Sequence, residues 1–171
     1  VIEASKGTGV SYTLKHFPGY GNNADTHLGA ATDNRTFEEI EGTDLPPFKE
    51  GIKVGAEAVL VSHNIVNSID NKNPASLSPS VHDLLRDNLS FTGVIITDDI
   101  AMNALQSIAD ITIKAIKAGN DLLITTDYEE SFNSLKKALN DNTITEDQLD
   151  RHVFRVLAWK YYKMLIIENE K

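Results

Sequence analysis

The amino-acid sequence predicts an α/β fold in which strands and helices alternate along the chain as (βα)4. Four short runs support this prediction, because each is too apolar or too β-branched for a strand with one solvated face. Such runs are typical of strands buried in a parallel sheet. Helical patterns separate the runs, and this alternation requires right-handed crossovers between parallel strands.

The elements can be placed from apolar spacing and from capping residues. The expected strands are Val10–Phe17, Ala56–His63, Gly93–Asp98 and Asp121–Thr126. Apolar residues at spacings of three and four predict the helices, with proline in the first turn of two of them and glycine closing two. The expected helices run from Asp44 to Val54, from Ser78 to Leu89, from Ala104 to Ala118, across Phe132–Leu139, and from Thr145 to about Leu165.

Polar or titratable residues stand at the carboxyl end of every expected strand. In chain order these ends are Lys15-His16, Ser62-His63, Thr97-Asp98-Asp99 and Thr125-Thr126-Asp127. An open sheet gathers only the strands beside its switch point, whereas all strand ends of a (β/α)8 barrel converge on one active-site face. We therefore expect four strands of a barrel, which is half of its eight.

Composition narrows the class of function. The 171 residues are 41% hydrophobic and 24% charged, as in one globular core. The net charge of -9 without a basic stripe disfavours partners such as nucleic acid or an anionic membrane. No apolar run reaches the roughly 18 residues of a membrane span. Without cysteine there is no disulfide, zinc–thiolate site or thiol nucleophile.

The segment KHFPGYGNNADTH, residues 15–27, concentrates titratable groups just after the first expected strand. A carboxylate two residues from a histidine can accept its ring N–H and raise its basicity, so Asp25 and His27 are candidates for general acid/base catalysis. Gly19, Gly21 and the asparagines that follow fit an ordinary surface loop equally well. In that alternative the aspartate and histidine form a solvated pair.

Asp98 and Asp99 close a buried apolar strand, so one of the two carboxylates must lie near the barrel mouth. There it can act as a nucleophile, a base or a metal ligand. The alternative is a helix N-cap, because an aspartate after a strand often accepts the first unpaired N–H groups of the next helix. Each residue can perform one of these tasks, and composition does not assign them.

His16 and His63 stand at strand ends, where each alone is best explained as a core histidine. Together with Asp25, His27 and Asp98 they would also make an oxygen–nitrogen metal site, as in a metal-dependent barrel hydrolase. The sequence has no His-x-His pair on a strand and no His-Glu-x-x-His motif to support that alternative. A sugar hydrolase needs a carboxylate nucleophile, a proton donor and groups that bond hydroxyls, and all three kinds are present.

Four stretches resemble one enzyme family in the same order. KHFPGYGNNADTHLG is similar to the KHFPGHG…DSH loop of the β-N-acetylglucosaminidases of glycoside hydrolase family 3. SHNIVNSIDNKNPASLS, LLRDNLSFTGVIITDDIAM and RHVFRVLAWK resemble further stretches of that family, so the likeness spans nearly the whole chain. The resemblance implies the C-terminal half of a (β/α)8 TIM barrel and a retaining double displacement on terminal β-linked GlcNAc.

The resemblance also implies catalytic roles. Asp98 matches the nucleophile, His27 matches the histidine acid/base of this subgroup, and Asp25 matches the partner that orients the histidine. Tyr20 stands where the family usually has histidine and Thr26 replaces serine, but neither change removes a catalytic atom.

Substrate-binding residues follow from the same resemblance. Lys15 and His16 match residues that hold sugar hydroxyls, and we expect His63 to contact the substrate as well. The expected ligand is a small saccharide, with no metal or other cofactor. A β-glucosidase of the same family is an alternative, but those enzymes place a carboxylic acid donor outside the Asp25–His27 loop. A non-catalytic binding module is the alternative from another class.

The expected half-barrel has a consequence for the isolated chain. The resemblance implies that the N-terminal half of the barrel is absent, together with its sugar-binding residues. We therefore expect residues 1–171 alone to be inactive, and either to self-associate or to pair with the missing half.

Overall fold

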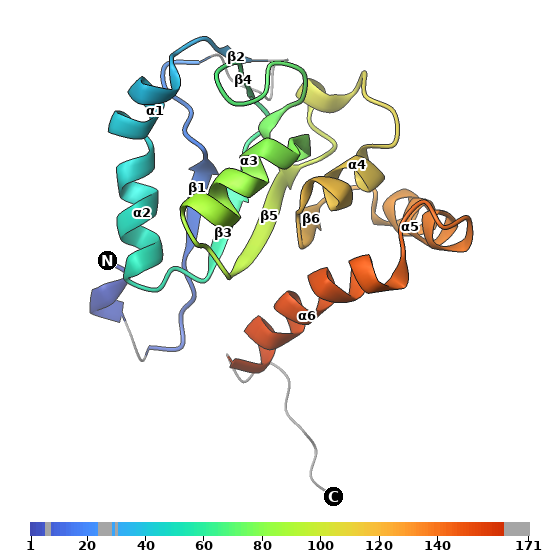
Figure 1. Ribbon diagram of the computed structural model, residues 1–171. Helices are drawn as coiled ribbons and strands as arrows, with labels where there is room; N and C mark the ends of the chain where they lie inside the picture. Colours follow the sequence, from blue (N-terminus) through green and yellow to red (C-terminus); the bar gives the residue numbers. More distant parts are fainter. Residues whose placement is uncertain (6–7, 24–28, 30, 163–171) are drawn as a thin grey trace, which may run out of the picture.

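The computed structural model describes residues 1–5, 8–23, 29 and 31–162. Its centre is a four-stranded parallel sheet of β1 (Thr13–Phe17), β3 (Ala58–Val61), β5 (Val94–Asp99) and β6 (Leu122–Ile124), in the order β1-β3-β5-β6 (Figure 1). The order of these four strands across the sheet is the same as their order along the chain. An open doubly wound sheet would instead reverse its strand order at one point. The predicted parallel (βα)4 alternation is confirmed, although three of the strands are shorter than expected.

The register brings the carboxyl ends of the strands to one edge of the sheet. Phe17 lies opposite Val61, Val61 opposite Thr97, and Asp99 opposite Ile124. In Figure 1 these ends point to the top of the molecule and the amino-terminal ends to the bottom. The loops that follow the strands therefore gather at the top.

Alternating side chains of the central strands belong to two different cores. Val59, Val61 and Ile95 join the larger core, which α2 (Leu45–Lys53) and α3 (Pro79–Asp83) help to form. Fully burying a side chain of this kind stabilises the fold by roughly 1.5–3 kcal/mol. The alternation explains why these runs look uniformly apolar in the sequence, since both faces of the strands carry apolar side chains, although Leu60 and Ile96 on the second face are only half-buried.

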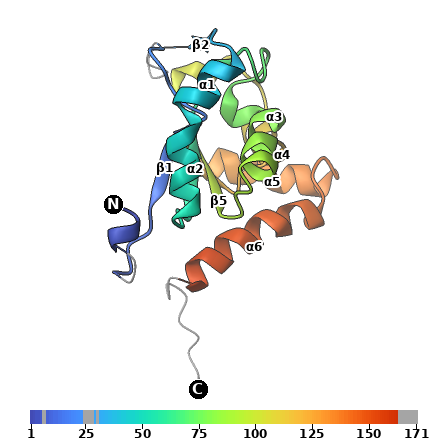
Figure 2. The ribbon, with the colours of Figure 1, turned by 60° about the vertical axis from the view of Figure 1, so that its left-hand side comes forward.

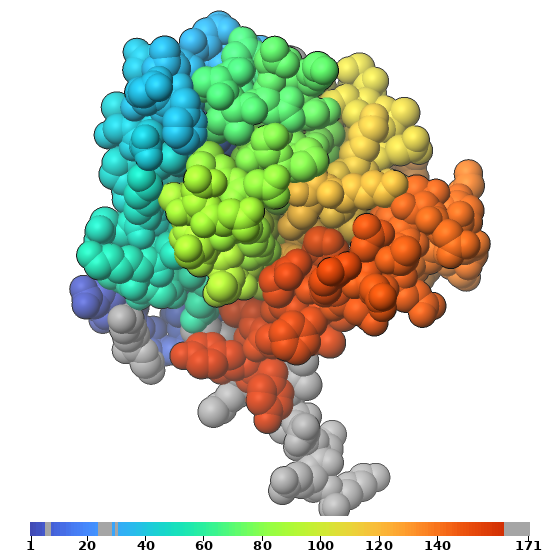
Figure 3. Space-filling model, in the orientation of Figure 1, coloured from blue at the N-terminus to red at the C-terminus, as the bar shows by residue number. Residues whose placement is uncertain are grey.

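α6 (Glu146–Tyr162) packs at the amino-terminal end of the sheet. Its Val156 and Trp159 form an apolar cluster with Ala58 and Val94, the first residues of β3 and β5. Figures 1 and 2 both show α6 beneath the strands, and in Figure 3 it lies across the lower part of the molecule. The helix therefore covers the end of the sheet opposite the strand ends that carry the candidate site.

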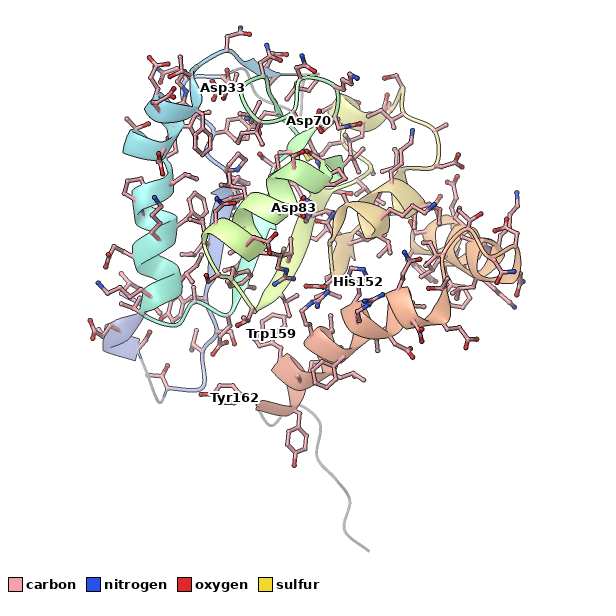
Figure 4. The ribbon with its side chains drawn as sticks, viewed as in Figure 1. Asp33, Asp70, Asp83, His152, Trp159 and Tyr162 are labelled. Carbon is pink, nitrogen blue, oxygen red and sulfur yellow. The ribbon has the colours of Figure 1, made fainter. Side chains whose placement is uncertain are left out.

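A buried carboxylate ties α6 to the sheet. The side chain of Asp121, just before β6, has no exposed surface, and its Oδ1 accepts hydrogen bonds from Nδ1 of His152 (2.9 Å) and Nε of Arg155 (2.8 Å). Its Oδ2 accepts from Nη2 of Arg86 (2.7 Å) and the backbone N–H of Ile95 (2.9 Å). Burial by itself would raise the pKa of Asp121, but these hydrogen bonds and the arginine charge lower it. Figure 4 shows His152 on the side of α6 that faces the sheet.

A small second sheet and a short helix were not predicted. β2 (Thr32–Asp33) pairs in parallel with β4 (Ile65–Val66) near the carboxyl ends of the main strands (Figure 1). α1 (Phe37–Thr43) follows β2 in the chain. It begins at a capping box, in which the side chains of Thr36 and Glu39 each accept a hydrogen bond from the other residue's backbone N–H. The Thr-x-x-Glu spacing was the available sequence signal for α1.

The third expected helix is shorter than predicted. Apolar spacing predicted one helix from Ala104 to Ala118, but α4 covers only Ile111–Ala118. Asp110 has a φ of 55°, in the left-handed region, and a right-handed helix does not continue through that conformation. Leu105 and Ile108 still share the apolar cluster of α4. Apolar side chains can be buried together without belonging to one continuous helix. Apolar spacing alone therefore predicted a helix that is too long.

The other helices agree more closely with expectation. α3 passes into a π-helical turn at Leu84–Asn88, within the range expected to be helical. α5 (Tyr128–Asn140) begins at Asp127, whose carboxylate caps it. α6 begins at Glu146, directly after Thr145, which forms the predicted capping box with Gln148 in the first turn; its expected last residues lie outside the described part of the chain. Among the described residues, no helix has the length and apolar character needed to cross a membrane.

Candidate active site

Two titratable side chains meet at the carboxyl edge of the sheet. Nε2 of His16, on β1, lies 3.8 Å from Oδ2 of Asp98, on β5. The side chains are 33% and 19% exposed, so solvent reaches both. β3 lies between β1 and β5, and the pair therefore bridges the end of the intervening strand. A ligand at this edge can contact groups from two strands.

The backbone holds the adjacent aspartates in different ways. Oδ1 of Asp98 accepts a hydrogen bond from the N–H of Asp99 (3.0 Å), which leaves Oδ2 as the oxygen directed at His16. Oδ1 of Asp99 accepts from the N–H of Ala101 (2.9 Å) and closes a local turn. The carboxylate of Asp99 is thus engaged with its own backbone, although α4 itself begins only at residue 111.

The end of β1 is anchored by one side chain and presents two others. Phe17 is fully buried in the larger core, whereas Lys15 is exposed. The peptide bonds Lys15–His16 and Phe17–Pro18 are cis. The ring of His16 contacts Tyr20 edge to face, with 5.7 Å between ring centroids. His16 is therefore held beside Asp98 by a strand that is fixed in the core, and Lys15 precedes it on the same strand.

His63 occupies a buried position at the end of β3. It is 1% exposed, its Nε2 lies 2.9 Å from the carbonyl oxygen of Asp99, and its Nδ1 lies 2.7 Å from Oγ of Ser76. Both ring nitrogens thus contact protein atoms, as in a core histidine. Sequence analysis did not single out Ser76, which lies thirteen residues further along, near the end of the SHNIVNSIDNKNPASLS stretch.

An ion-pair cluster, also missed by sequence analysis, lies beside the loop after β1. Nε and Nη2 of Arg35 donate to the buried carboxylate of Asp33, at 3.0 and 2.6 Å, and Nη2 lies 2.5 Å from Oδ2 of Asp44. Burial by itself would raise the pKa of Asp33, but the hydrogen bonds from Arg35 lower it. The Asp-x-Arg spacing of Asp33 and Arg35 was the sequence signal from which this ion pair could have been predicted. Figure 4 places Asp33 at the same end of the molecule as the strand ends.

Two glycines allow the chain to run close against this cluster. A Cβ at Gly19 would collide with the side chain of Asp44, and one at Gly21 would lie 2.7 Å from Nη2 of Arg35. Both glycines also have positive φ values, of 138° and 53°. The start of the loop after β1 is therefore fixed in position by close packing.

The acid/base candidates Asp25 and His27 lie outside the described residues, and their roles stay predictions from the sequence. In the part of the chain that the structure describes, no three His, Asp or Glu side chains form a group that could hold a metal ion. Asp98 and His16 are the predicted site residues that the structure brings together at the accessible edge of the sheet, and Lys15 is exposed next to His16 on β1.

Comparisons with known proteins identify the family of the chain. The sequence profile of the glycosyl hydrolase family 3 N-terminal domain matches residues 1–159. A curated β-hexosaminidase of Stenotrophomonas maltophilia is 38% identical over 128 residues, which are 72% of this chain and 38% of that protein. The chain thus spans well under half the length of this curated relative.

Solved structures show the same likeness. A glycoside hydrolase family 3 β-N-acetylglucosaminidase from Paenibacillus sp. str. FPU-7 matches with a TM-score of 0.85 and 32% identity, over 95% of this chain and 34% of that one. A β-glucoside phosphorylase matches with a TM-score of 0.84 and 29% identity, over 92% of this chain and 31% of that one.

A parallel sheet whose main strands follow chain order, with titratable groups at its carboxyl edge, is typical of barrel-type α/β enzymes. Within that class, the chain belongs to glycosyl hydrolase family 3, and it matches the N-terminal domain of the family.

Proposed function

We propose that the protein is a retaining exo-β-N-acetylglucosaminidase that removes terminal β-linked GlcNAc from cell-wall or chitin-type saccharides. The observation that carries the proposal is the Asp98 carboxylate at the edge of the sheet, with one oxygen held by the backbone and the other directed at His16. The β-hexosaminidase and β-N-acetylglucosaminidase relatives support GlcNAc as the sugar. A small neutral sugar also suits a chain of net charge -9 without a basic stripe.

The proposed reaction has two displacements. In the first, Oδ2 of Asp98 attacks the anomeric carbon, and the bond to the leaving oxygen breaks as His27 gives that oxygen a proton. In the second, water attacks the same carbon, a proton passes to His27, and the Asp98 carboxylate leaves. Two inversions retain the β configuration. Asp25 accepts the ring N–H of His27 and so keeps it basic enough for the second step.

Sugar binding is assigned to the side chains at the end of β1. Lys15 is exposed and His16 is partly exposed, so both can bond hydroxyl groups of a sugar whose anomeric carbon faces Asp98. His63 was also expected to bind the sugar, but its ring is buried, which favours a different role.

We further propose that additional strands complete the sheet into a (β/α)8 barrel, with this chain as the C-terminal half. β1 and β6 are the edge strands of the described sheet, and unpaired strand edges favour association with further strands. Ile124 at the edge is 42% exposed. The completing strands can belong to the same protein or to a separate chain, and self-association is the alternative.

The test uses the barrel-complete protein, which is this chain together with the strands that complete the eight-stranded barrel. In that protein the experiment traps the covalent intermediate. The probe is a fluorinated GlcNAc donor with a good leaving group, whose enzyme-bound ester hydrolyses slowly. Mass spectrometry is expected to find the label on the peptide that contains Asp98, and Asp98→Asn should remain unlabelled. An aryl β-glucoside serves as the matched substrate control and should react more slowly than the aryl β-GlcNAc. A label on another residue refutes the assignment, and activity that requires added zinc after chelation favours a metal hydrolase.

Phosphate is a second candidate acceptor because the chain is similar to a β-glucoside phosphorylase. Turnover of an aryl β-GlcNAc in phosphate buffer distinguishes the two outcomes. Free GlcNAc as the product supports hydrolysis, and GlcNAc 1-phosphate supports phosphorolysis.

A further inference from the structure

We propose that His63 is a positioning residue that fixes the backbone next to the nucleophile, and that it is not a ligand of the sugar. The inference rests on the proposed function of Asp98. Three observations carry it: the contacts of the His63 ring, the way in which Asp99 connects those contacts to Asp98, and the burial of His63 in an otherwise open sheet.

The ring contacts determine which nitrogen carries the proton. A carbonyl oxygen only accepts hydrogen bonds, so Nε2 of His63 must donate to the carbonyl of Asp99 across 2.9 Å. In the neutral ring Nδ1 then accepts from the hydroxyl of Ser76 across 2.7 Å. His63 therefore connects the Ser76 segment to the residue that directly follows the nucleophile.

Asp99 connects His63 to the reacting carboxylate. Its carbonyl accepts from His63 and from the N–H of Met102 (3.0 Å), while its own N–H donates to Oδ1 of Asp98 (3.0 Å). The backbone groups on both sides of the Asp99 Cα are thus fixed. Since the Asp99 N–H orients Oδ1, a shift of this residue would turn the Oδ2 that attacks the sugar.

Ser76 gives His63 a rigid support. Ser76 is fully buried, its N–H donates to the carbonyl of Ser62 (2.9 Å), and its own carbonyl accepts from Nδ2 of Asn120 (2.7 Å). Ser62 directly precedes His63, and Asn120 precedes β6. The support is therefore built from the ends of two strands that flank β5.

Burial separates His63 from the sugar-binding candidates. It is 1% exposed even though the described sheet is open at both edges, whereas His16 is 33% exposed beside Asp98. A ring that donates to Asp99 and is covered from solvent would have to leave that carbonyl to bond a hydroxyl. Removing His63 should therefore slow the chemical step and leave sugar affinity unchanged.

The experiment compares His63→Leu with His63→Gln in the barrel-complete protein. Leucine fills a similar space without a donor, whereas the glutamine amide can still donate to the Asp99 carbonyl. We measure kcat with an aryl β-GlcNAc, and we measure the dissociation constant of GlcNAc itself by calorimetry. His63→Leu is expected to lower kcat about 10²-fold, the order expected for a misplaced reacting group. Its dissociation constant should equal that of the parent, and His63→Gln should retain most of the activity.

The controls separate a positioning role from a general structural role. His152→Leu removes a histidine hydrogen bond at the opposite end of the sheet and should leave both quantities unchanged. Should His63→Leu fail to fold, Ser76→Ala removes the partner of Nδ1 and should lower kcat in the same direction without weakening GlcNAc binding.

Three outcomes overturn the proposal. A loss of GlcNAc affinity that matches the loss of kcat makes His63 a sugar ligand. Equal losses in His63→Leu and His63→Gln remove the donor role, and unchanged kcat in His63→Leu removes any role. In each case a labelled Asp98 in the trapping experiment keeps the proposed function intact, whereas an unlabelled Asp98 refutes both.

Discussion

At the scale of single residues, identical side chains acquire different roles from the hydrogen bonds around them. Asp98 and Asp99 are adjacent, yet Asp99 closes a turn on Ala101 while Oδ2 of Asp98 is directed at His16. His16 and His63 differ in the same way, since the first is accessible and the second is buried. Contacts, rather than residue type, distinguish the proposed reacting groups from the proposed supporting ones.

The first prediction concerns this aspartate pair. In the barrel-complete protein, Asp98→Ala should abolish turnover of an aryl β-GlcNAc, because the nucleophile is lost. Asp99→Ala should keep much more activity, because it removes one turn hydrogen bond and leaves the Asp99 backbone groups in place. Steady-state rates of the two variants decide the assignment, and an inactive Asp99→Ala beside an active Asp98→Ala would reverse it.

The second prediction concerns the proton donor. His27→Ala should slow substrates with poor leaving groups much more than aryl substrates with good ones, because only poor leaving groups need protonation. General acid catalysis is typically worth about 10²–10⁴-fold. The measurement is kcat/KM across a series of leaving groups, with Asp98→Ala as the control that should lose activity on all of them. Equal losses across the series for His27→Ala would remove it from the acid role.

At the scale of elements, α6 lies at the opposite end of the sheet from the candidate site. Its apolar cluster and the buried Asp121 network connect it to the amino-terminal ends of the strands. In barrel folds this end contributes to stability and the carboxyl end to catalysis. Substitutions that remove the hydrogen bonds of Asp121 should therefore change the free energy of unfolding more than they change the affinity for substrate.

The third prediction tests that separation. Asp121→Asn should lower the free energy of unfolding by roughly 1.5–3 kcal/mol at neutral pH, because it leaves the half-buried guanidinium groups of Arg86 and Arg155 without their carboxylate. The folded-state pKa of Asp121 is lowered, so its stabilisation is present above the ordinary pKa of 3.8 and is lost as pH falls through the lower folded-state value. The difference between parent and variant in urea unfolding should therefore shrink at acid pH.

Asp150→Asn is the matched control for this measurement. Asp150 is an exposed carboxylate on α6, and its substitution should change the free energy of unfolding little at any pH. A destabilisation of Asp121→Asn that matched the control, or one that grew as pH fell, would contradict the role assigned to the network.

At the scale of the whole molecule, the described sheet is open. β1 and β6 have one strand neighbour each, and α6 carries exposed apolar side chains on its outer surface. These large exposed side chains include Val153, Phe154, Leu157, Tyr161 and Tyr162. Unpaired edges and apolar surface together favour association with further protein.

The fourth prediction concerns residues 1–171 as a separate protein. They should associate with themselves in solution, because the strand edges and the exposed apolar surface are uncovered. They should also show little glycosidase activity, since small misplacements of a substrate can cost about 10²-fold in rate. Light scattering and an aryl β-GlcNAc assay on the same sample test both parts. A monodisperse monomer as active as the barrel-complete protein would refute the half-barrel proposal.

The sequence by itself determined the succession of strands and helices and the chemistry at the strand ends. Buried parallel strands are apolar along their whole length, so the four core strands were visible locally, as were their polar ends. The KHFPGYGNNADTH and ITDDIAM motifs indicated the family before any contact was known. Short elements such as β2 and β4 were missed, because two residues carry no periodicity.

Only the tertiary structure decided which polar groups meet. His63 contacts Asp99, thirty-six residues further along the chain, and Asp121 contacts Arg155, thirty-four residues further along. Such pairs depend on sheet register and on helix docking, which apolar spacing does not encode. The same reason explains Asp110, whose left-handed backbone interrupts a pattern that looked helical. Local periodicity reports burial, but hydrogen-bond partners are set by the packing of distant segments against each other.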